Sequence, residues 1–315
     1  MTRTHTLRRV LSIAVLLIAS ATPALRAQTV DDGIVLRGGE LFAGNMFVHD
    51  RWDEYWEGTL KRDNGNIGTL TTRTNSWFGT YGVTDRLNVL VTLPYVWTRA
   101  SQGVLEGMEG VQDISLSAKY LAIERSSTPL GRLRAIAVGS IGLPITNYTP
   151  DFQPLSIGSA SKRVAGRFTV NLQSDPGWFV NGSAAHTWRA TVTLDRPYYF
   201  TDDEFFLTDR VDMPNVFDYV ASGGYLKRGV MLAFMFSQQR TLGGGDIRRQ
   251  DMPFVSNRMN FSRIGGTAMH PIPKLRDLAV QASYGYTIEG RNVGQSTTYA
   301  VGVLYSRQLF RRRTP

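Results

Sequence analysis

The stretch LNVLVTLPYVW, residues 87–97, decides the fold class. Its odd-numbered residues form an unbroken apolar face that ends in a tyrosine and a tryptophan. Residues 113–122, 163–173 and 278–289 repeat the alternation, with polar side chains between the apolar ones. A period of two residues over such lengths is typical of β-strands with one apolar face, whereas an amphipathic helix repeats about every 3.6 residues. The chain is therefore expected to fold as β-strands.

The same alternation along the whole chain predicts twelve strands. They are expected at 41–49, 68–83, 87–100, 111–124, 132–145, 161–173, 178–192, 215–226, 229–241, 257–269, 277–288 and 297–310. The main alternative is a soluble β-sandwich, whose strands average about five or six residues and turn their apolar faces into a core. Most of the predicted strands are longer, and their length suits a tilted membrane span of about 9–11 residues with ends beyond the bilayer.

The links between the predicted strands alternate between short and long. The short links are 84–86, 125–131, 174–177, 227–228 and 270–276, and the long links are 50–67, 101–110, 146–160, 193–214, 242–256 and 289–296. In an up-and-down sheet this order places all short links at one end and all long links at the other, as in bacterial outer-membrane barrels. The predicted fold is all-β: a single antiparallel transmembrane β-barrel of about 12 strands, with short periplasmic turns and long outer loops.

Composition excludes other classes of protein. Of the 315 residues, 42% are hydrophobic and 19% are charged, which argues against a disordered chain. After the first 30 residues the longest apolar run, 230–236, is far shorter than the roughly 20 residues of a spanning helix. The chain has no cysteine, so disulfides, thiolate catalysis and cysteine-type zinc sites are excluded.

The N-terminus has the features of a secretory signal peptide. Arg3, Arg8 and Arg9 precede an apolar stretch, and small residues follow up to Ala27. We expect residues 1–27 to be a cleaved signal peptide, 28–40 a periplasmic N-terminal segment, 41–310 the barrel and 311–315 a basic tail. Cleavage removes four arginines and no acid, so the net charge falls from +9 to +5. The remaining basic residues are scattered, and nucleic acid is therefore not an expected partner.

Charge predicts which strand face points into the barrel. A Lys or Arg on the lipid face near the middle of the bilayer costs about 2–4 kcal/mol, so the polar face should line the lumen. The candidate lumen-lining residues are Asp113, Lys119, Arg163, Arg167, Asn171, Arg189 and Glu289. Two roles stay open for Arg163 and Arg167: a row that selects anions, or counterions for acids such as Asp113 and Glu289.

The longest outer loop contains an acidic triplet between aromatic clusters. The candidates for a constriction at the barrel mouth are Tyr198, Tyr199, Asp202, Asp203, Glu204 and Phe205. The alternative is an ordered outer loop whose aromatic residues pack on the rim and whose acids are solvated.

Several stretches resemble a family of Gram-negative outer-membrane proteins named for the meta-pathway of phenol degradation and often labelled simply "transporter". The likeness lies in YGVTDRLNV at 81–89 with LPY at 93–95, in GVQDI at 110–114 with AKY at 118–120, and in YAVGVLY at 299–305. Gln112 stands where a glycine is usual, and the chain continues past the aromatic residue at 310. The resemblance implies a barrel and suggests transport of small molecules, with hydrophobic or aromatic ones as candidates.

The expected function is a narrow channel or transporter in the cell outer membrane, since twelve strands fall between the filled eight-stranded barrel and the open barrels of about sixteen. The alternatives are a barrel that only supports the envelope or displays loops and, more distantly, an outer-membrane hydrolase. No enzyme activity, metal or cofactor is expected, because the histidines lie apart and His186 and Ser183 should occupy opposite strand faces. The expected partners are outer-membrane lipid and lipopolysaccharide, the barrel-assembly machinery and an unidentified small solute.

Overall fold

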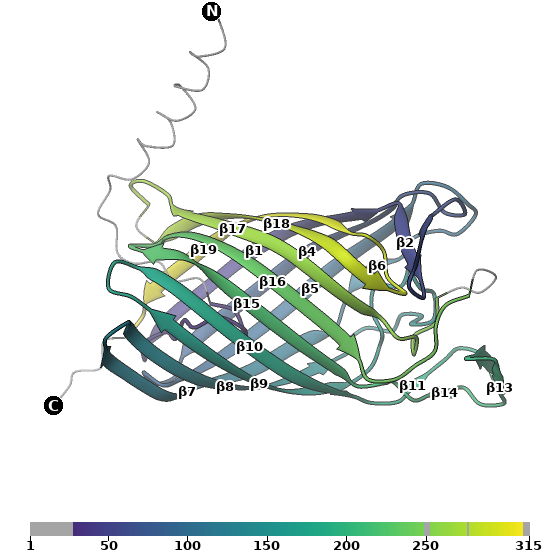
Figure 1. The fold of residues 1–315 in the computed structure, drawn as a ribbon, viewed down its shortest axis with the longest axis horizontal. Coiled ribbons are helices and arrows are strands. Elements are labelled where there is room, and N and C mark those ends of the chain that lie inside the picture. The colour runs from purple at the N-terminus through teal and green to yellow at the C-terminus, as the bar shows by residue number, and fades with distance from the viewer. Residues whose placement is uncertain (1–27, 249–252, 276, 311–315) are drawn as a thin grey trace, which may run out of the picture.

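Twelve long strands form a closed antiparallel barrel in the computed structural model, which describes residues 28–248, 253–275 and 277–310 (Figure 1). The strands are β1 (Glu40–Trp52), β4 (Leu70–Gly82), β5 (Leu87–Ala100), β7 (Ile114–Thr128), β8 (Gly131–Leu143), β9 (Arg163–Gln173), β10 (Trp178–Arg189), β15 (Val216–Lys227), β16 (Val230–Thr241), β17 (Asn260–Pro271), β18 (Leu278–Arg291) and β19 (Thr297–Gln308). Each of the twelve predicted strands corresponds to one of these, so the predicted fold class is confirmed.

Each long strand pairs with its neighbours along the chain, and the first and last strands close the barrel. β1 and β19 pair from Glu40 opposite Gln308 to Arg51 opposite Thr297. The links at one end are tight: between β15 and β16, Arg228 and Gly229 both have positive φ, the conformation of a two-residue hairpin turn. Among the described residues, no helix is long and apolar enough to cross a membrane.

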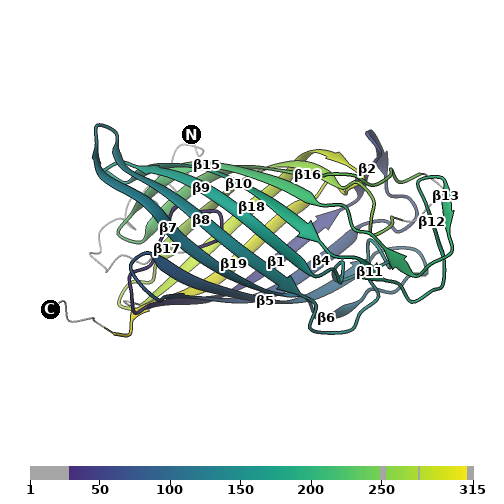
Figure 2. The ribbon, with the colours of Figure 1, turned by 90° about the horizontal axis from the view of Figure 1, so that it is seen from below.

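Seven shorter strands lie in the long links at the other end of the barrel (Figure 2). They are β2 (Glu54–Glu57), β3 (Leu60–Asp63), β6 (Glu109–Val111), β11 (Val192–Thr193), β12 (Tyr199–Thr201), β13 (Glu204–Phe206) and β14 (Arg210–Val211). β6 pairs with the end of β5, and the others form three small two-stranded sheets. The outer loops are therefore largely ordered.

The outward face of the barrel is largely apolar. Val180, Phe234 and Val301 are more than half exposed, at 63%, 69% and 58%. Exposed Trp178 packs edge-on against Tyr225 near the short-turn end, and exposed Trp188 lies near the long-loop end. Apolar side chains on the outside, with aromatic residues towards both ends, are typical of a membrane barrel and are the reverse of a soluble sandwich.

Candidate functional site

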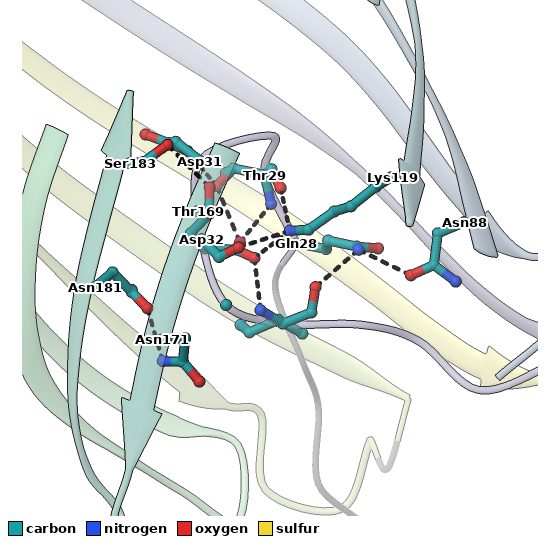
Figure 3. A network of polar contacts seen from close by, with 12 residues as sticks. Gln28, Thr29, Asp31, Asp32, Asn88, Lys119, Thr169, Asn171, Asn181 and Ser183 are labelled. Carbon is teal, nitrogen blue, oxygen red and sulfur yellow. Dashed lines mark hydrogen bonds and ion pairs between the residues drawn. The ribbon is translucent and has the colours of Figure 1, made fainter. Parts of the chain in front are cut away.

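Residues 28–39, which we call the N-terminal segment, lie in the lumen at the short-turn end of the barrel, where the Gly38 N–H donates to Asp85 of the first short turn. Figure 3 shows how Gln28, Thr29 and Asp32 of the segment meet the wall residues Asn88 and Lys119. Lys119 of β7 holds the segment from the wall, and its side chain is fully buried. Its Nζ donates to the carbonyl oxygens of Thr29, at 2.7 Å, and Asp32, at 2.9 Å. It also pairs with Oδ1 of Asp32 at 2.7 Å. All three donor positions of the ammonium group are thus used on the segment.

Two further wall residues bind the backbone of the N-terminal segment. The Asn88 side chain of β5 accepts from the Leu36 N–H at 2.8 Å and donates to the Leu36 carbonyl at 3.1 Å, like a partner strand. Its Oδ1 also accepts from the Gln28 side chain at 2.9 Å. From β8, Arg134 donates to the carbonyl of Gly33 at 3.2 Å.

Apolar contacts complete the anchor of the N-terminal segment. Leu36 is fully buried in a cluster with the wall residues Phe42, Met269, Ala279 and Leu304. Its neighbour Val35 lies in a second cluster, with Leu121, Ile136 and Val138. Full burial of such a side chain contributes about 1.5–3 kcal/mol. The N-terminal segment is therefore packed firmly against the inner wall at the short-turn end.

The strand pattern correctly predicts that Lys119 points into the lumen, but it does not predict that Lys119 binds Thr29 and Asp32 of the N-terminal segment. Residues 28–40 were predicted to be a periplasmic N-terminal segment, whereas residues 28–39 lie within the lumen. The one available signal was the pair Val35-Leu36, which is apolar and would be exposed outside. The domain boundaries at 27, 40 and 310 stay predictions, and the signal peptide and the basic tail lie outside the described residues.

The inward arginines of β9 are both paired with acids from other strands. Nη1 of Arg163 lies 2.7 Å from Oδ2 of Asp113, and Arg167 pairs with Asp218 of β15. The Tyr148 hydroxyl, from the 144–162 loop, donates to Asp113 at 2.6 Å. Burial of this hydroxyl and its contact with the Asp113 carboxylate raise the pKa of Tyr148. The arrangement favours the counterion role for both arginines.

The other candidate lumen residues make separate contacts. Asn171 donates to the Asn181 side chain at 2.6 Å, and Nε of Arg189 donates to the Pro214 carbonyl at 2.6 Å. Glu289 is exposed and lies 3.5 Å from the Ser262 hydroxyl, not beside either inward arginine. The predicted pairing of Glu289 with an inward arginine is therefore wrong. The reason is a β-bulge in the β17–β18 ladder, which interrupts the alternation of strand faces before Glu289.

The acidic triplet of the longest outer loop lies at an exposed hairpin tip. Asp202 and Asp203 have positive φ between β12 and β13, which project beyond the barrel end (Figure 2). Asp203 pairs with Arg248 of the next long loop, and Glu204 is exposed. This position favours the ordered-loop interpretation over the constriction.

The aromatic residues beside the triplet divide into two groups. Tyr198 and Phe205 pack on each other at 5.4 Å and are exposed. Tyr199 is buried, and its ring stacks on Phe206 at 4.8 Å and on Phe254 at 5.2 Å. This outer cluster also contains Val192, Leu194, Val211, Met213 and Val255, and it holds two long loops together.

Three hollows follow one another along one side of the lumen. The first, of about 410 Å³, is lined by Arg167, Asp218, Val220 and Met235 among others. The second, of about 320 Å³, shares the last two of these residues and lies against the N-terminal segment. The third, of about 260 Å³ at the short-turn end, shares Ile34, Gln173 and Leu226 with the second. The hollows are therefore neighbours in a row past the N-terminal segment, and their volumes decrease towards the short turns.

Among the described residues, Ser183 and His186 are not placed together for hydrolysis, and no metal site is formed. Ser183 is buried on the lumen side of β10, whereas the His186 ring packs on Trp188, at 4.4 Å, on the outward side. The described part of the chain contains no group of three His, Cys, Asp or Glu side chains that could hold a metal ion.

Comparison with known proteins agrees with this architecture. An outer membrane channel from Pseudomonas putida F1 superposes with a TM-score of 0.69 at 15% identity, covering 90% of this chain and all of the other. The NanC porin gives a TM-score of 0.47 at 8% identity, covering 82% of this chain and 98% of the porin. Among curated proteins, no sequence matches the chain. The family model described as "Putative MetA-pathway of phenol degradation" matches residues 64–303, well over half of the chain, and the chain therefore belongs to this family.

Proposed function

We propose that the protein is a narrow outer-membrane channel that passes small solutes along one side of its lumen. The observation that carries the proposal is the row of three hollows beside the N-terminal segment. A barrel that served only to display loops or support the envelope would need no such row. The N-terminal segment packs against the wall at the short-turn end through Val35 and Leu36, and it reduces the space through which a solute can pass.

The lining of the middle hollow indicates the class of solute. Asn171, Asn181 and Gln281 offer amide donors and acceptors, while Phe179 and Met231 offer apolar surface. Its volume of about 320 Å³ is at the lower limit of ligand pockets, which run from about 300 to 1,000 Å³. A single-ring molecule with one or two hydrogen-bonding groups fits these properties. The family description supports the same class, since phenol is a hydroxylated ring.

We also propose the cellular setting that this function requires. The apolar outward face supports insertion in the outer membrane after export and removal of residues 1–27, with the barrel-assembly machinery as the partner for insertion. No catalysis is proposed, because Ser183 and His186 occupy opposite faces of the wall.

The proposal is tested with a substitution that fills the middle hollow. The flux of solutes into proteoliposomes is measured from the rate at which they swell. Ala233→Trp places an indole in the hollow, and Ala268→Trp, on the outward face of the neighbouring strand, is the matched control. We expect the first variant to lose most of the flux of single-ring solutes and the control to keep it, with both still heat-modifiable in detergent gels. Equal flux through the wild type and Ala233→Trp would refute the proposed route.

A further inference from the structure

Three arginines lie together on the outward face of the barrel, away from the lumen. Arg51 of β1, Arg73 of β4 and Arg99 of β5 are all exposed. Arg51 is opposite Thr71, which is opposite Arg99, and Arg73 is two residues from Thr71 on the same strand. Strands are about 4.8 Å apart and rise about 3.4 Å per residue, so the three Cα atoms lie roughly 8–10 Å from one another.

Neighbouring aromatic residues indicate that the three arginines lie near the membrane–water boundary at the long-loop end. Arg73 is opposite Trp97 on one side and His49 on the other, and His49 is opposite exposed Tyr299. From Tyr81, near the short turns, to Arg73 is eight residues, which span about 20 Å of bilayer after strand tilt. A basic residue at this depth is much less destabilising than one at the midplane of the bilayer.

A hollow of about 730 Å³ lies over two of these arginines. Phe47 and Trp97 supply apolar surface, Arg73 and Arg99 line it, and the loop after β5 contributes Gly107, Met108 and other residues. Glu109 also lines the hollow and offsets one positive charge. Within the described residues, none of the three guanidinium groups has a hydrogen bond or an ion pair, in contrast to the paired arginines of the lumen.

We propose that this surface binds the phosphate groups of lipid A, the phosphorylated glycolipid of the outer leaflet. Guanidinium groups bind phosphate oxygens in a bidentate manner, and three of them on adjacent strands suit a ligand with two separated phosphates. The aromatic surface below them suits the start of an acyl chain. The site is independent of the proposed channel function, because it lies on the other face of the wall.

The test compares the binding of diphosphorylated lipid A to purified variants in detergent. In Arg73→Gln/Arg99→Gln two charges are removed from the hollow, and in the matched control Lys162→Gln/Arg240→Gln two exposed charges are removed elsewhere on the barrel. At about 1 kcal/mol for each basic residue near an anionic surface, the first variant should bind roughly thirty-fold more weakly, while the control should bind as the wild type does.

The probes are diphosphorylated lipid A, monophosphoryl lipid A and inorganic phosphate. Native mass spectrometry measures how many lipid molecules are bound to each variant. We expect monophosphoryl lipid A to bind more weakly than the diphosphorylated form and inorganic phosphate to compete only weakly. Unchanged lipid A affinity in heat-modifiable Arg73→Gln/Arg99→Gln would overturn the proposal. Equal loss in the control variant, or displacement of lipid A by inorganic phosphate at comparable concentration, would overturn it as well.

Discussion

Lys119→Met is expected to release the N-terminal segment and widen the channel. Methionine keeps much of the length of the side chain but removes the ammonium group that binds Thr29 and Asp32. Breaking a buried ion pair by removing one partner costs about 3–5 kcal/mol. The Asp32 side chain is 19% exposed, so water can partly solvate the carboxylate that remains, and we take the lower value.

A loss of about 3 kcal/mol raises the ratio of released to docked segment by about 140-fold. Single-channel recording in planar bilayers measures this ratio as the fraction of time spent at high conductance. Lys162→Met is the control, because it removes the same charge from an exposed position outside the lumen. If Lys119→Met folds and gives the same conductance distribution as the wild type, the segment does not limit the pore.

Three further predictions test the contacts around the lumen and the outer loops. Arg163→Gln/Arg167→Gln should lower the thermal stability of the barrel and leave the reversal potential in a salt gradient unchanged, because both arginines are paired with acids. Gly33→Ala should displace the N-terminal segment and raise conductance, since its Cβ would lie 2.2 Å from a β9 side-chain atom. Arg291 lowers the pKa of Asp246 below its ordinary value of 3.8, so the outer-loop contact should contribute fully above pH 3.8 and be lost only as the pH falls through the lowered pKa, which hydrogen exchange of residues 242–248 would detect.

The sequence predicts the barrel well because the strands of a membrane barrel alternate regularly between apolar outward residues and inward residues. Each strand in a bilayer must turn an apolar face outward, so period-2 patterning reports both the strand and its orientation. The inward orientation of Lys119 and Arg167 follows from this rule alone. The alternation of short and long links then indicates an up-and-down arrangement, in which each strand pairs with its neighbours along the chain.

The sequence does not predict contacts that depend on distant partners. Lys119 meets Asp32 across 87 residues, and Arg167 meets Asp218 across 51, so no local pattern reports either pair. The N-terminal segment lacks strand periodicity because Asn88 and Lys119 bind its backbone through side chains rather than through a ladder. The bulge before Glu289 adds one residue to a strand, a change that the apolar pattern does not reveal.

The size dependence of solute flux through the wild-type protein is the most direct test of the narrow route beside the N-terminal segment. Swelling rates of proteoliposomes are measured for a single-ring phenolic solute, a disaccharide and a trisaccharide, at equal osmolarity and protein density. Because the smallest hollow of the row has a volume of about 260 Å³, we predict measurable flux for the single-ring solute and almost none for the two sugars. Flux of all three in proportion to their diffusion in water would contradict a narrow route beside the N-terminal segment, and so would an absence of flux for the single-ring solute.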